Sequence, residues 1–561
     1  MVVFWGGSSS NLGKGGSEYI APVFAWFLRQ LYWRAYVYYR VSMFKRLLIL
    51  VAVGLALYLP ALPNHFVWDD EEQVVANTAV HSVANIPQLF VGSTFNSGGA
   101  GNLGGLYYKP LMSVGFAVIY GVFGPSPWAF HLLQIGLHIG SGLLLYLILR
   151  KIWKNDFLAL LTSMLFLIHP QNVETVGYIS SLQDTLYMFL GMLGLKWIVI
   201  SENTICWKDL IFSGMCVFLA LLSKETGGLF GILIGLYILL FHKRRDLVKW
   251  LEVLCIVYGF YLYLRIGVAQ VGLDKNMFTP MATLPLTVRL GNIPALVWHY
   301  LSQFVWSSRL SISQHWVNSN PGFLQGTVLC GLIVSWLMIL WLAIKNKGRI
   351  FGFFWVWFGV AMVFHLQIFP LDMTVADRWF YLPMVGFIGS MGSMVERSWI
   401  VDRRWLRVVM VIIMIALFVR SSIRIQNWRD GMTLYSHDIQ IMSESFDLQN
   451  NYGVELYRAR RYDEARVYFE KSTVTAPTWW TNWNNLGVII EQEGDLDTAL
   501  TDYRRAIDNG QYYLAYENYA RILLKQNKWQ EARLFLENSL RLFPNNQNLL
   551  DLYRYERINE R

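Results

Sequence analysis

Charged residues are scarce in this sequence. Asp, Glu, Lys and Arg make up 15% of the 561 residues, whereas soluble domains contain about 25%. This shortage excludes a chain built only of water-soluble domains. Because 55% of the residues are hydrophobic and the mean hydropathy is +0.35, the composition predicts a large surface in contact with lipid.

Cysteine is scarce too. The four cysteines, Cys206, Cys216, Cys255 and Cys330, lie in or beside apolar segments. None has the spacing of metal ligands, and the pattern argues against a disulfide framework. The sequence therefore assigns no cofactor, and it leaves open whether a divalent metal takes part.

The few charges are unevenly distributed along the chain. Residues 446–561 contain 15 basic and 17 acidic residues, whereas the rest contains 32 basic and 21 acidic residues. A balanced, soluble C-terminal part is thus joined to an apolar, basic body. Lys and Arg collect in the cytoplasmic loops of membrane proteins, so the basic excess does not indicate a nucleic-acid partner.

Long apolar runs occupy the basic body. Runs near 20 residues predict membrane-spanning helices, and about eleven are present. They cover residues 44–62, 127–149, 156–170, 175–200, 207–223, 226–241, 247–266, 324–344, 351–370, 377–396 and 405–423. We expect a transmembrane domain over 43–430 with a first outer loop at 63–126.

The positions of the basic residues predict the topology. With the N-terminus inside, basic clusters at 150–154, 243–245, 345–349 and 397–407 also lie inside, provided that 286–310 does not span. We therefore expect 286–310, which is apolar but contains charged residues, to be interfacial or re-entrant. An odd number of spans places the C-terminal part on the non-cytoplasmic side, in the periplasm, the exterior or the ER lumen.

The N-terminal residues carry no recognisable function. No small-residue cleavage site follows the first span, so no cleavable signal is predicted. Met43-Phe-Lys-Arg is typical of a natural start before an apolar helix. We interpret residues 1–42 as an N-terminal extension, with a mis-assigned start as the alternative.

The C-terminal part repeats itself with a period of about 34 residues. Three sets of small or closing residues align: Gly453, Gly487 and Ala520; Ala465, Ala499 and Ala532; Pro477, Gly510 and Pro544. This period is typical of tetratricopeptide (TPR) repeats, with about three over 446–550 and a tail at 551–561. Such a solenoid has a concave face for extended peptides or another protein. A passive spacer or dimerisation module is the alternative.

Several charged residues fall on the outer side in this topology. Charges in or beside a membrane are costly, so each needs a reason. The set comprises Asp69, Asp70, Lys109, His169, Glu174, Asp184, Lys224, Glu225 and Arg378, together with Tyr381. Taken singly, each has an ordinary explanation, such as a solvated acid or a local ion pair. Their convergence on one side of the membrane favours a site.

This set of side chains suits a lipid-linked phosphosugar, whose tail stays in the bilayer. A carboxylate can deprotonate an acceptor hydroxyl, and we expect Asp69 or Asp70 to be this base. Basic and polar groups can neutralise the departing phosphate, and the candidates are Lys109, His169, Lys224, Arg378 and Tyr381. Glu174, Asp184 and Glu225 are expected to support them.

Five segments in order carry a resemblance to a known family. They are Phe66-Val-Trp-Asp-Asp, Tyr108-Lys-Pro-Leu, Phe166-Leu-Ile-His-Pro-Gln-Asn-Val-Glu, Ser223-Lys-Glu-Thr-Gly and Val375-Ala-Asp-Arg-Trp-Phe-Tyr-Leu-Pro. Together with the repeats, they resemble the transmembrane and TPR-repeat-containing O-mannosyltransferases and their prokaryotic relatives. These belong to the GT-C glycosyltransferase superfamily. The resemblance implies a polyprenyl-phosphate or dolichyl-phosphate sugar donor, inverting transfer, an outward-facing site and a key acid at Asp69 or Asp70.

The sequence departs from this family at three positions. The family usually has Arg where Lys109 stands and Glu where Asp377 stands, and both changes keep the charge. It tends to have Arg-Ala-Asp where this chain has Leu182-Gln-Asp184. Because this Arg is missing, the sequence does not predict the identity of the donor sugar.

The resulting prediction is an all-α protein, a GT-C-type helix bundle followed by a TPR solenoid. Its expected function is transfer of a mannose-like sugar to a hydroxyl of protein Ser or Thr, with the acceptor bound through the repeats. The alternatives are a non-catalytic membrane-anchored TPR scaffold and an oligosaccharide ligase of the O-antigen type. A scaffold would not need Asp69 and Asp70, and a ligase places its key groups in a late outer loop.

Overall fold

The computed structural model describes residues 41–559 except 97, 100, 102, 202–204, 273–278, 346–347 and 397–403. Nearly all of residues 1–42 therefore lie outside the described part. Within it, helices alternate with loops and no β-strand occurs; Gln314 and Val375 form an isolated antiparallel bridge. The prediction of an all-α protein with apolar helices and a helical repeat is confirmed.

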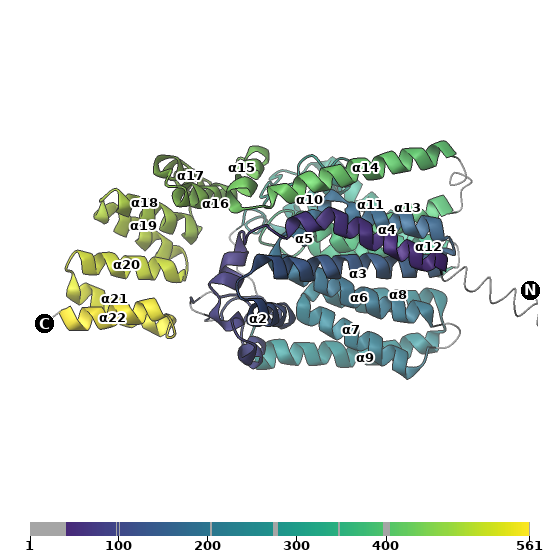
Figure 1. Ribbon diagram of the computed structural model, residues 1–561, viewed down its shortest axis with the longest axis horizontal. Coiled ribbons are helices and arrows are strands. Elements are labelled where there is room, and N and C mark those ends of the chain that lie inside the picture. The colour runs from purple at the N-terminus through teal and green to yellow at the C-terminus, as the bar shows by residue number, and fades with distance from the viewer. Residues whose placement is uncertain are drawn as a thin grey trace, which may run out of the picture.

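The first part of the chain forms a bundle of helices that run roughly parallel to one another (Figure 1). It comprises a helix at Val41–Ala61, α2 Pro110–Phe123, α3 Pro127–Trp153, α4 Asp156–Ile168, α5 Val173–Gly177, α6 Leu182–Ile200, α7 Trp207–Ser223, α8 Leu229–Phe241, α9 Arg244–Leu262, α10 Leu286–Val305, α11 Phe323–Ile344, α12 Arg349–Met362, α13 Tyr381–Glu396, α14 Arg404–Asn427 and α15 Gly431–Ile441.

Five helices among the described residues are long and apolar enough to cross a membrane: Val41–Ala61, Pro127–Trp153, Arg244–Val268, Phe323–Ile344 and Trp405–Asn427. Shorter apolar helices lie between them. The chain is thus a multi-pass membrane protein, and eleven spans stays a prediction. The stretch predicted to be interfacial forms the continuous helix α10, which contains Pro294.

Local sequence explains where α3 and α4 begin and end. Proline at the first position of α3 lacks only an N–H that would have no intrahelical partner. At the other end Lys154 adopts a left-handed conformation (φ 57°), and the Asn155 side chain accepts a hydrogen bond from the Leu158 N–H of α4 (3.1 Å). The resulting tight turn packs α4 back against α3.

The first outer loop is folded rather than extended. It contains the short helices η2 Glu71–Val75, η3 Thr78–Val80 and η4 Val83–Phe90, followed by α2. Apolar side chains of this loop, including Val74, Leu89 and Phe116, pack on Phe130 and Leu182 of the bundle. This separate apolar cluster fixes the loop against the ends of α3 and α6.

The C-terminal helices form antiparallel pairs, as the 34-residue period predicts. They are α16 Phe446–Arg458, α17 Tyr462–Thr475, α18 Trp480–Gln492, α19 Leu496–Asn509, α20 Tyr513–Lys525, α21 Trp529–Leu542 and α22 Gln547–Asn559. Within each of the first two pairs the helices approach closely at glycine. A Cβ at Gly453 would lie 2.6 Å from the Phe469 ring, and one at Gly487 would lie 2.8 Å from the Tyr503 ring.

Buried charges join the repeats to the bundle. Arg424 of α14 donates to both carboxylate oxygens of Asp438 in α15 (2.6 and 3.0 Å). Asp438 also accepts from the backbone N–H of Ile312 (2.8 Å). One helix later, Asp447 of α16 pairs with His315 (3.0 Å). The loop after α10 therefore holds α15 and α16 in a fixed position on the bundle.

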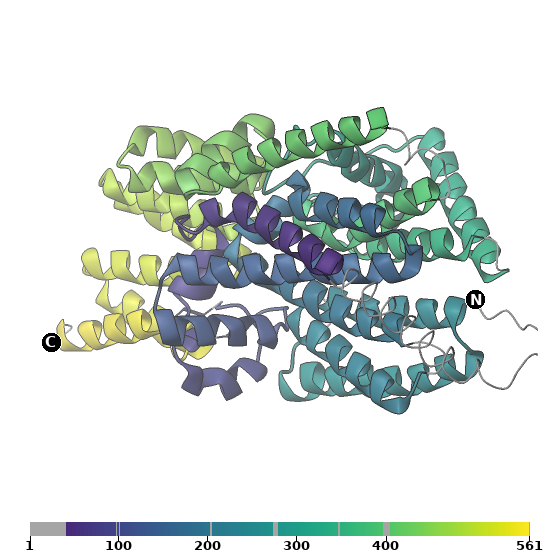
Figure 2. The ribbon, with the colours of Figure 1, turned by 45° about the vertical axis from the view of Figure 1, so that its right-hand side comes forward.

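The repeats and the first outer loop lie at the same end of the bundle. The loop, purple in Figures 1 and 2, lies between the bundle and the yellow repeat helices. Arg458 of α16 donates both arms of its guanidinium to Glu71 of the loop. At the opposite end of the bundle, Arg46 and Arg150 share the carboxylate of Asp156.

This arrangement predicts that Glu71 and the repeats face the same aqueous compartment, the non-cytoplasmic one. A glycosylatable or protease-cleavable tag in the first outer loop and a second tag after Arg561 should be modified or cleaved together in intact membranes. A tag beside Lys154 should be protected under the same conditions. Protection of the C-terminal tag with exposure of Lys154 would contradict the topology.

Candidate active site

A cavity of about 300 Å³ opens where the first outer loop meets the bundle. Its lining brings together side chains from segments that are far apart in the sequence. The polar and charged ones include Asp69, Tyr107, Lys109, Tyr178, Lys224, Glu225, Arg265, His365, Asp372 and Arg378. Of the predicted site residues, the cavity therefore gathers one of the two acids, three of the basic residues and Glu225.

Asp69 and Asp70 differ in what surrounds them. The side chain of Asp69 lines the cavity. Asp70 is fully buried, and its carboxylate accepts hydrogen bonds from the Ser180 N–H (2.7 Å), the Ser180 hydroxyl (2.6 Å) and the Val67 N–H (3.1 Å). Asp70 thus fastens the loop to the start of α6, and Asp69 is the one of the two acids that lines the cavity.

The electrostatic environments of these two acids also differ. Burial raises the pKa of Asp69, and Asp372 raises it further, while Tyr178, Arg378 and Lys109 act in the opposite direction. Burial raises the pKa of Asp70 to about 7, against the effect of its hydrogen bonds to Ser180 and Val67. Asp69 therefore combines access to the cavity with a higher proton affinity than a solvated carboxylate.

The backbone just before Asp69 has an unusual conformation. Trp68 has a φ of 56°, in the left-handed region that costs a non-glycine residue about 1–2 kcal/mol. Its indole stacks on the Tyr178 ring (centroids 5.4 Å apart), and Tyr178 stacks on Trp428 (5.6 Å). This aromatic stack, together with the Asp70 contacts, stabilises the turn that directs Asp69 into the cavity.

Arg378 reaches the cavity from the short helix η10 Asp377–Phe380, which immediately precedes α13. It forms a buried ion pair with Glu174 of α5, and its backbone N–H also lies against that carboxylate (3.4 Å). The guanidinium carbon lies 5.6 Å from the Trp68 ring centroid and 5.8 Å from that of Tyr178. Glu174 and the two rings thus fix the guanidinium beside Asp69.

Two further basic side chains are paired with acids around the cavity. Lys224 Nζ lies 2.7 Å from Asp184 Oδ1, and Asp184 is fully buried. Arg265 Nη1 lies 2.5 Å from Glu225 Oε1 and also donates to the Tyr261 hydroxyl (3.2 Å). Predicted supporting acids therefore hold the cationic groups in position, which limits the cost of burying them.

Lys109 lines the cavity from the first outer loop, immediately before α2. Its Nζ is 4.3 Å from the Tyr107 ring centroid and 5.9 Å from that of Phe95. Its backbone N–H donates to the Thr94 hydroxyl (2.6 Å). The loop thus supplies one cation, and the bundle supplies the others.

Two predicted donor-binding residues do not line the cavity. His169 stacks on the Phe304 ring (centroids 4.6 Å apart), hydrogen bonds to the Phe304 carbonyl (3.0 Å) and accepts from the Gln171 N–H. The Tyr381 hydroxyl bonds to His138 Nδ1 (2.7 Å) inside the bundle. Both residues are fully buried, so the structure gives them packing roles in place of contact with a ligand in this cavity.

The cavity also contains residues that sequence analysis missed. Arg265 was counted within an apolar span, and an arginine inside such a span is itself a signal of function. Asp372 and His365 lie in the irregular segment between α12 and α13, where no periodicity marked them. The sequence offered one clue to these residues, because charged residues near the outer ends of predicted spans are candidates for a site on that side.

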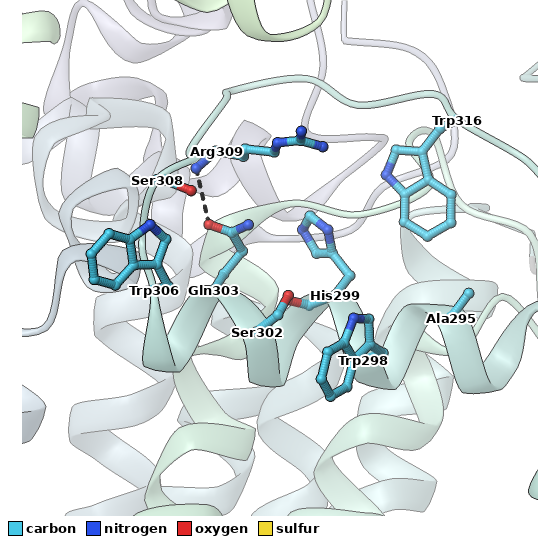
Figure 3. Close-up of a pocket in the computed structure, with 9 residues that line it drawn as sticks. All are labelled: Ala295, Trp298, His299, Ser302, Gln303, Trp306, Ser308, Arg309 and Trp316. Carbon is cyan, nitrogen blue, oxygen red and sulfur yellow. Dashed lines mark hydrogen bonds between the residues drawn. The ribbon is translucent and has the colours of Figure 1, made fainter.

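A second cavity, of about 400 Å³, lies on α10 and the loop that follows it. Figure 3 shows its lining, which includes Trp298, Trp306 and Trp316 around Arg309. The backbone N–H of Arg309 donates to Gln303 Oε1 (3.1 Å). No predicted site residue lines this cavity, so it is separate from the site around Asp69.

The described residues contain no group of three or more His, Cys, Asp or Glu side chains arranged to hold a metal ion. Three cations of the site form ion pairs: Arg378 with Glu174, Lys224 with Asp184 and Arg265 with Glu225. Such a site is suited to an anionic ligand that contacts Arg and Lys while a carboxylate faces its reacting atom.

Known proteins are similar to this chain over most of its length. Residues 109–265 match the family described as dolichyl-phosphate-mannose-protein mannosyltransferase. Over 485 residues, the chain is 22% identical to the mouse protein O-mannosyl-transferase TMTC3, covering 77% of this chain and 51% of that protein. The chain is similar to the protein O-mannosyltransferases. This confirms the resemblance inferred from its motifs.

A second relative and a solved structure extend the comparison. A protein O-mannosyl-transferase of Caenorhabditis elegans is 23% identical over 417 residues, which is 73% of this chain and 59% of that protein. The chain thus spans between half and three-fifths of the length of these relatives. The archaeal oligosaccharyltransferase AglB from Archaeoglobus fulgidus matches with a TM-score of 0.40 and 13% identity, over 77% of this chain and 60% of that one.

The contrast between the two acids predicts opposite effects on stability. Asp70→Asn replaces the carboxylate oxygen that accepts from the Val67 N–H with a carboxamide N–H. Two donors then face each other, which should destabilise the protein by about 1–3 kcal/mol. Asp69→Asn, the matched control, removes a buried charge without an equivalent loss and should leave the melting temperature unchanged or higher. Thermal unfolding in detergent, followed by Trp fluorescence, measures both. Equal destabilisation by the two changes would contradict the assignment.

Proposed function

We propose that this protein is a membrane glycosyltransferase of the GT-C type. In this proposal it transfers a sugar from a polyprenyl-phosphate donor to a hydroxyl group on the non-cytoplasmic side of the membrane. The observation that carries the proposal is the cavity in which Asp69 faces Arg378, Lys109 and Lys224. The similarity to protein O-mannosyltransferases supports it, and residues 43–430 are the proposed catalytic domain.

The basic residues are proposed to bind the donor phosphate. Arg378 offers a planar fork that matches two phosphate oxygens, and Lys224 and Lys109 add point charges. Arg378 is already oriented by Glu174, and Lys224 is already oriented by Asp184. Little reorganisation is then needed as negative charge develops on the departing phosphate. The lipid tail stays in the bilayer between the helices.

Asp69 is proposed to act as the general base. It takes the proton of the acceptor hydroxyl as the hydroxyl oxygen bonds to the anomeric carbon of the sugar. The bond from that carbon to the phosphate oxygen breaks, and the electron pair leaves with the polyprenyl phosphate. A single displacement of this kind inverts the anomeric centre. The raised pKa of Asp69 brings it closer to the range in which a base works efficiently near neutral pH.

The acceptor is proposed to be a protein Ser or Thr delivered by the TPR repeats over 446–550. Support comes from the ion pair of Arg458 with Glu71, because it holds the repeats against the loop that carries Asp69. A non-catalytic scaffold would also need the repeats. It would not need four cations and three acids lining one cavity, each at an energetic cost.

The direct test of the proposal is a transfer assay. Purified protein in nanodiscs is incubated with polyprenyl-phosphate mannose, glucose or N-acetylglucosamine and a Ser/Thr-rich peptide, and sugar loss from the lipid is measured together with gain on the peptide. Loss from the lipid with equal gain on the peptide supports the proposal. Binding of the peptide without turnover of any donor would favour the scaffold.

Asp69→Asn should abolish transfer while membrane insertion and folding stay intact. The substitution keeps the shape of the side chain but removes the base, which typically costs about 10²–10⁴ in rate. In the unmodified protein the rate should fall as pH is lowered through the raised pKa of Asp69, because the protonated carboxyl cannot accept a proton. Steady-state rates between pH 4 and about 8 check this. Full activity of Asp69→Asn would exclude the assignment.

Arg378→Lys should lower the affinity for the donor strongly and the stability of the fold only slightly. Lysine keeps the charge that balances Glu174 but loses the fork, so the donor KM should rise about 10–100-fold, the equivalent of one charge-assisted hydrogen bond. Arg378→Ala leaves Glu174 buried without its partner and should destabilise the bundle as well. An unchanged KM in Arg378→Lys would mean that the fork serves Glu174 alone, and the phosphate site would then lie around Lys109 and Lys224.

A further inference from the structure

Asparagine recurs at one register of the repeats. Asn451, Asn485 and Asn518 each lie two residues before the small residue at which the helices of a pair approach, Gly453, Gly487 and Ala520. Each asparagine lies on the first helix of its pair, α16, α18 or α20. A carboxamide contributes nothing to apolar packing between helices, so its return in three consecutive repeats has to be explained by another role.

Hydrogen bonds connect these asparagines across the repeats. Asn450 donates to Asn451 Oδ1 (3.1 Å), and Asn485 donates to Asn450 Oδ1 (2.9 Å). Asn484 donates to Asn485 Oδ1 (3.1 Å), and Asn518 donates to Asn484 Oδ1 (3.0 Å). The five side chains thus form one continuous row, the asparagine row, that crosses all three repeats. The bonds fix the orientation of every carboxamide.

The asparagine row keeps unused hydrogen-bonding capacity. Each carboxamide has two N–H donors and two acceptor positions. Asn485 uses one donor and one acceptor within the row, and Asn518 donates to Asn484 and accepts from Arg521 (2.9 Å). Asn451, Asn485 and Asn518 are half-buried, so the remaining groups are accessible from one side.

The asparagine row lies on a face of the repeat helices that is close to the first outer loop. Arg458 lies seven residues after Asn451, two turns along the same face of α16, and its guanidinium binds Glu71. Glu71 is two residues after Asp69. At the other end of the row, Asn546 donates to the Gly98 carbonyl of the first outer loop (3.2 Å). The first outer loop therefore contacts the repeats near both ends of the row, and Figure 1 shows this loop beside the repeat helices.

We propose that the asparagine row binds the main chain of an extended, unfolded segment of the acceptor polypeptide. A peptide backbone presents alternating N–H and C=O groups, and a fixed carboxamide can donate to one and accept from the other. Recognition of this kind is independent of side-chain sequence. The row then holds the polypeptide so that successive hydroxyl residues can enter the cavity. This inference rests on the proposed function and specifies how its acceptor is selected.

Binding is tested on the full chain in nanodiscs without any sugar donor. The probe is a fluorescein-labelled Ser/Thr-rich peptide of about 20 residues, which spans ~66 Å when extended. A peptide of scrambled sequence should bind with the same Kd. A peptide with N-methylated backbone amides should bind at least about tenfold more weakly, since each lost hydrogen bond costs about 0.5–1.5 kcal/mol. Loss of binding on scrambling would overturn the proposal in favour of a sequence-specific or folded partner.

Variants of the protein provide the second arm of the test. The triple change Asn451→Ala, Asn485→Ala and Asn518→Ala should weaken peptide binding at least about tenfold. The matched control is Asn538→Ala, an exposed asparagine on the second helix α21, and it should bind as the unmodified chain does. Equal binding by the triple variant and the control would overturn the proposal. If circular dichroism shows that the triple variant is unfolded, the proposal is decided by how strongly the N-methylated peptide binds to the unmodified chain.

The transfer assay separates this inference from the proposed function. A tripeptide acceptor is too short to engage the row and the cavity together. The triple variant should therefore keep full activity on the tripeptide and lose activity on the long peptide through a raised KM. Asp69→Asn should bind the long peptide normally and transfer to neither acceptor. Normal KM of the triple variant for the long peptide would refute the row as the acceptor site, and it would leave the catalytic assignment intact.

Discussion

The buried carboxylate of Asp70 is the contact on which the site depends. Its hydrogen bonds to Ser180 and Val67 tie the first outer loop to the start of α6 across 110 residues of sequence. This anchor keeps Trp68 in its left-handed conformation, and the stacked ring of Tyr178 supports it. Asp69, the next residue, then lies in the cavity. The acid that binds the structure together and the acid proposed for chemistry are thus neighbours with separate tasks.

The cavity keeps its cations in place through pairs of opposite charge. Glu174, Asp184 and Glu225 each hold one of Arg378, Lys224 and Arg265. A lone cation buried at a membrane surface would be too costly, and a fully neutralised pair would bind no anion. Side chains that are paired on one side and open to a cavity on the other meet both requirements. The same logic applies at the junction, where Arg424–Asp438 and His315–Asp447 fasten the repeats to the bundle.

The short motifs of the sequence contain residues that line the cavity and residues that do not. Lys109, Lys224 and Arg378 stand at helix starts or turns, where polarity in an apolar context is visible in the sequence. His169 and Tyr381 stand in the same motifs, yet their side chains turn inward to Phe304 and His138. Arg265 and Asp372 have no motif around them, and they reach the cavity only because α9 and the segment before α13 converge there. Motif membership indicates proximity to a site and does not give the direction of a side chain.

The sequence by itself determined the all-α class, the apolar bundle and the 34-residue period, because each depends on residues that are near one another in the chain. Spacing of apolar runs predicts helices, and recurring small residues predict how repeats pack. Only the tertiary structure distinguished Asp69 from Asp70, joined Arg378 to Glu174 across 204 residues, and brought the repeats that carry the asparagine row against the first outer loop. These features depend on where side chains from distant segments meet. That meeting is decided by the packing of whole helices, which no local pattern records.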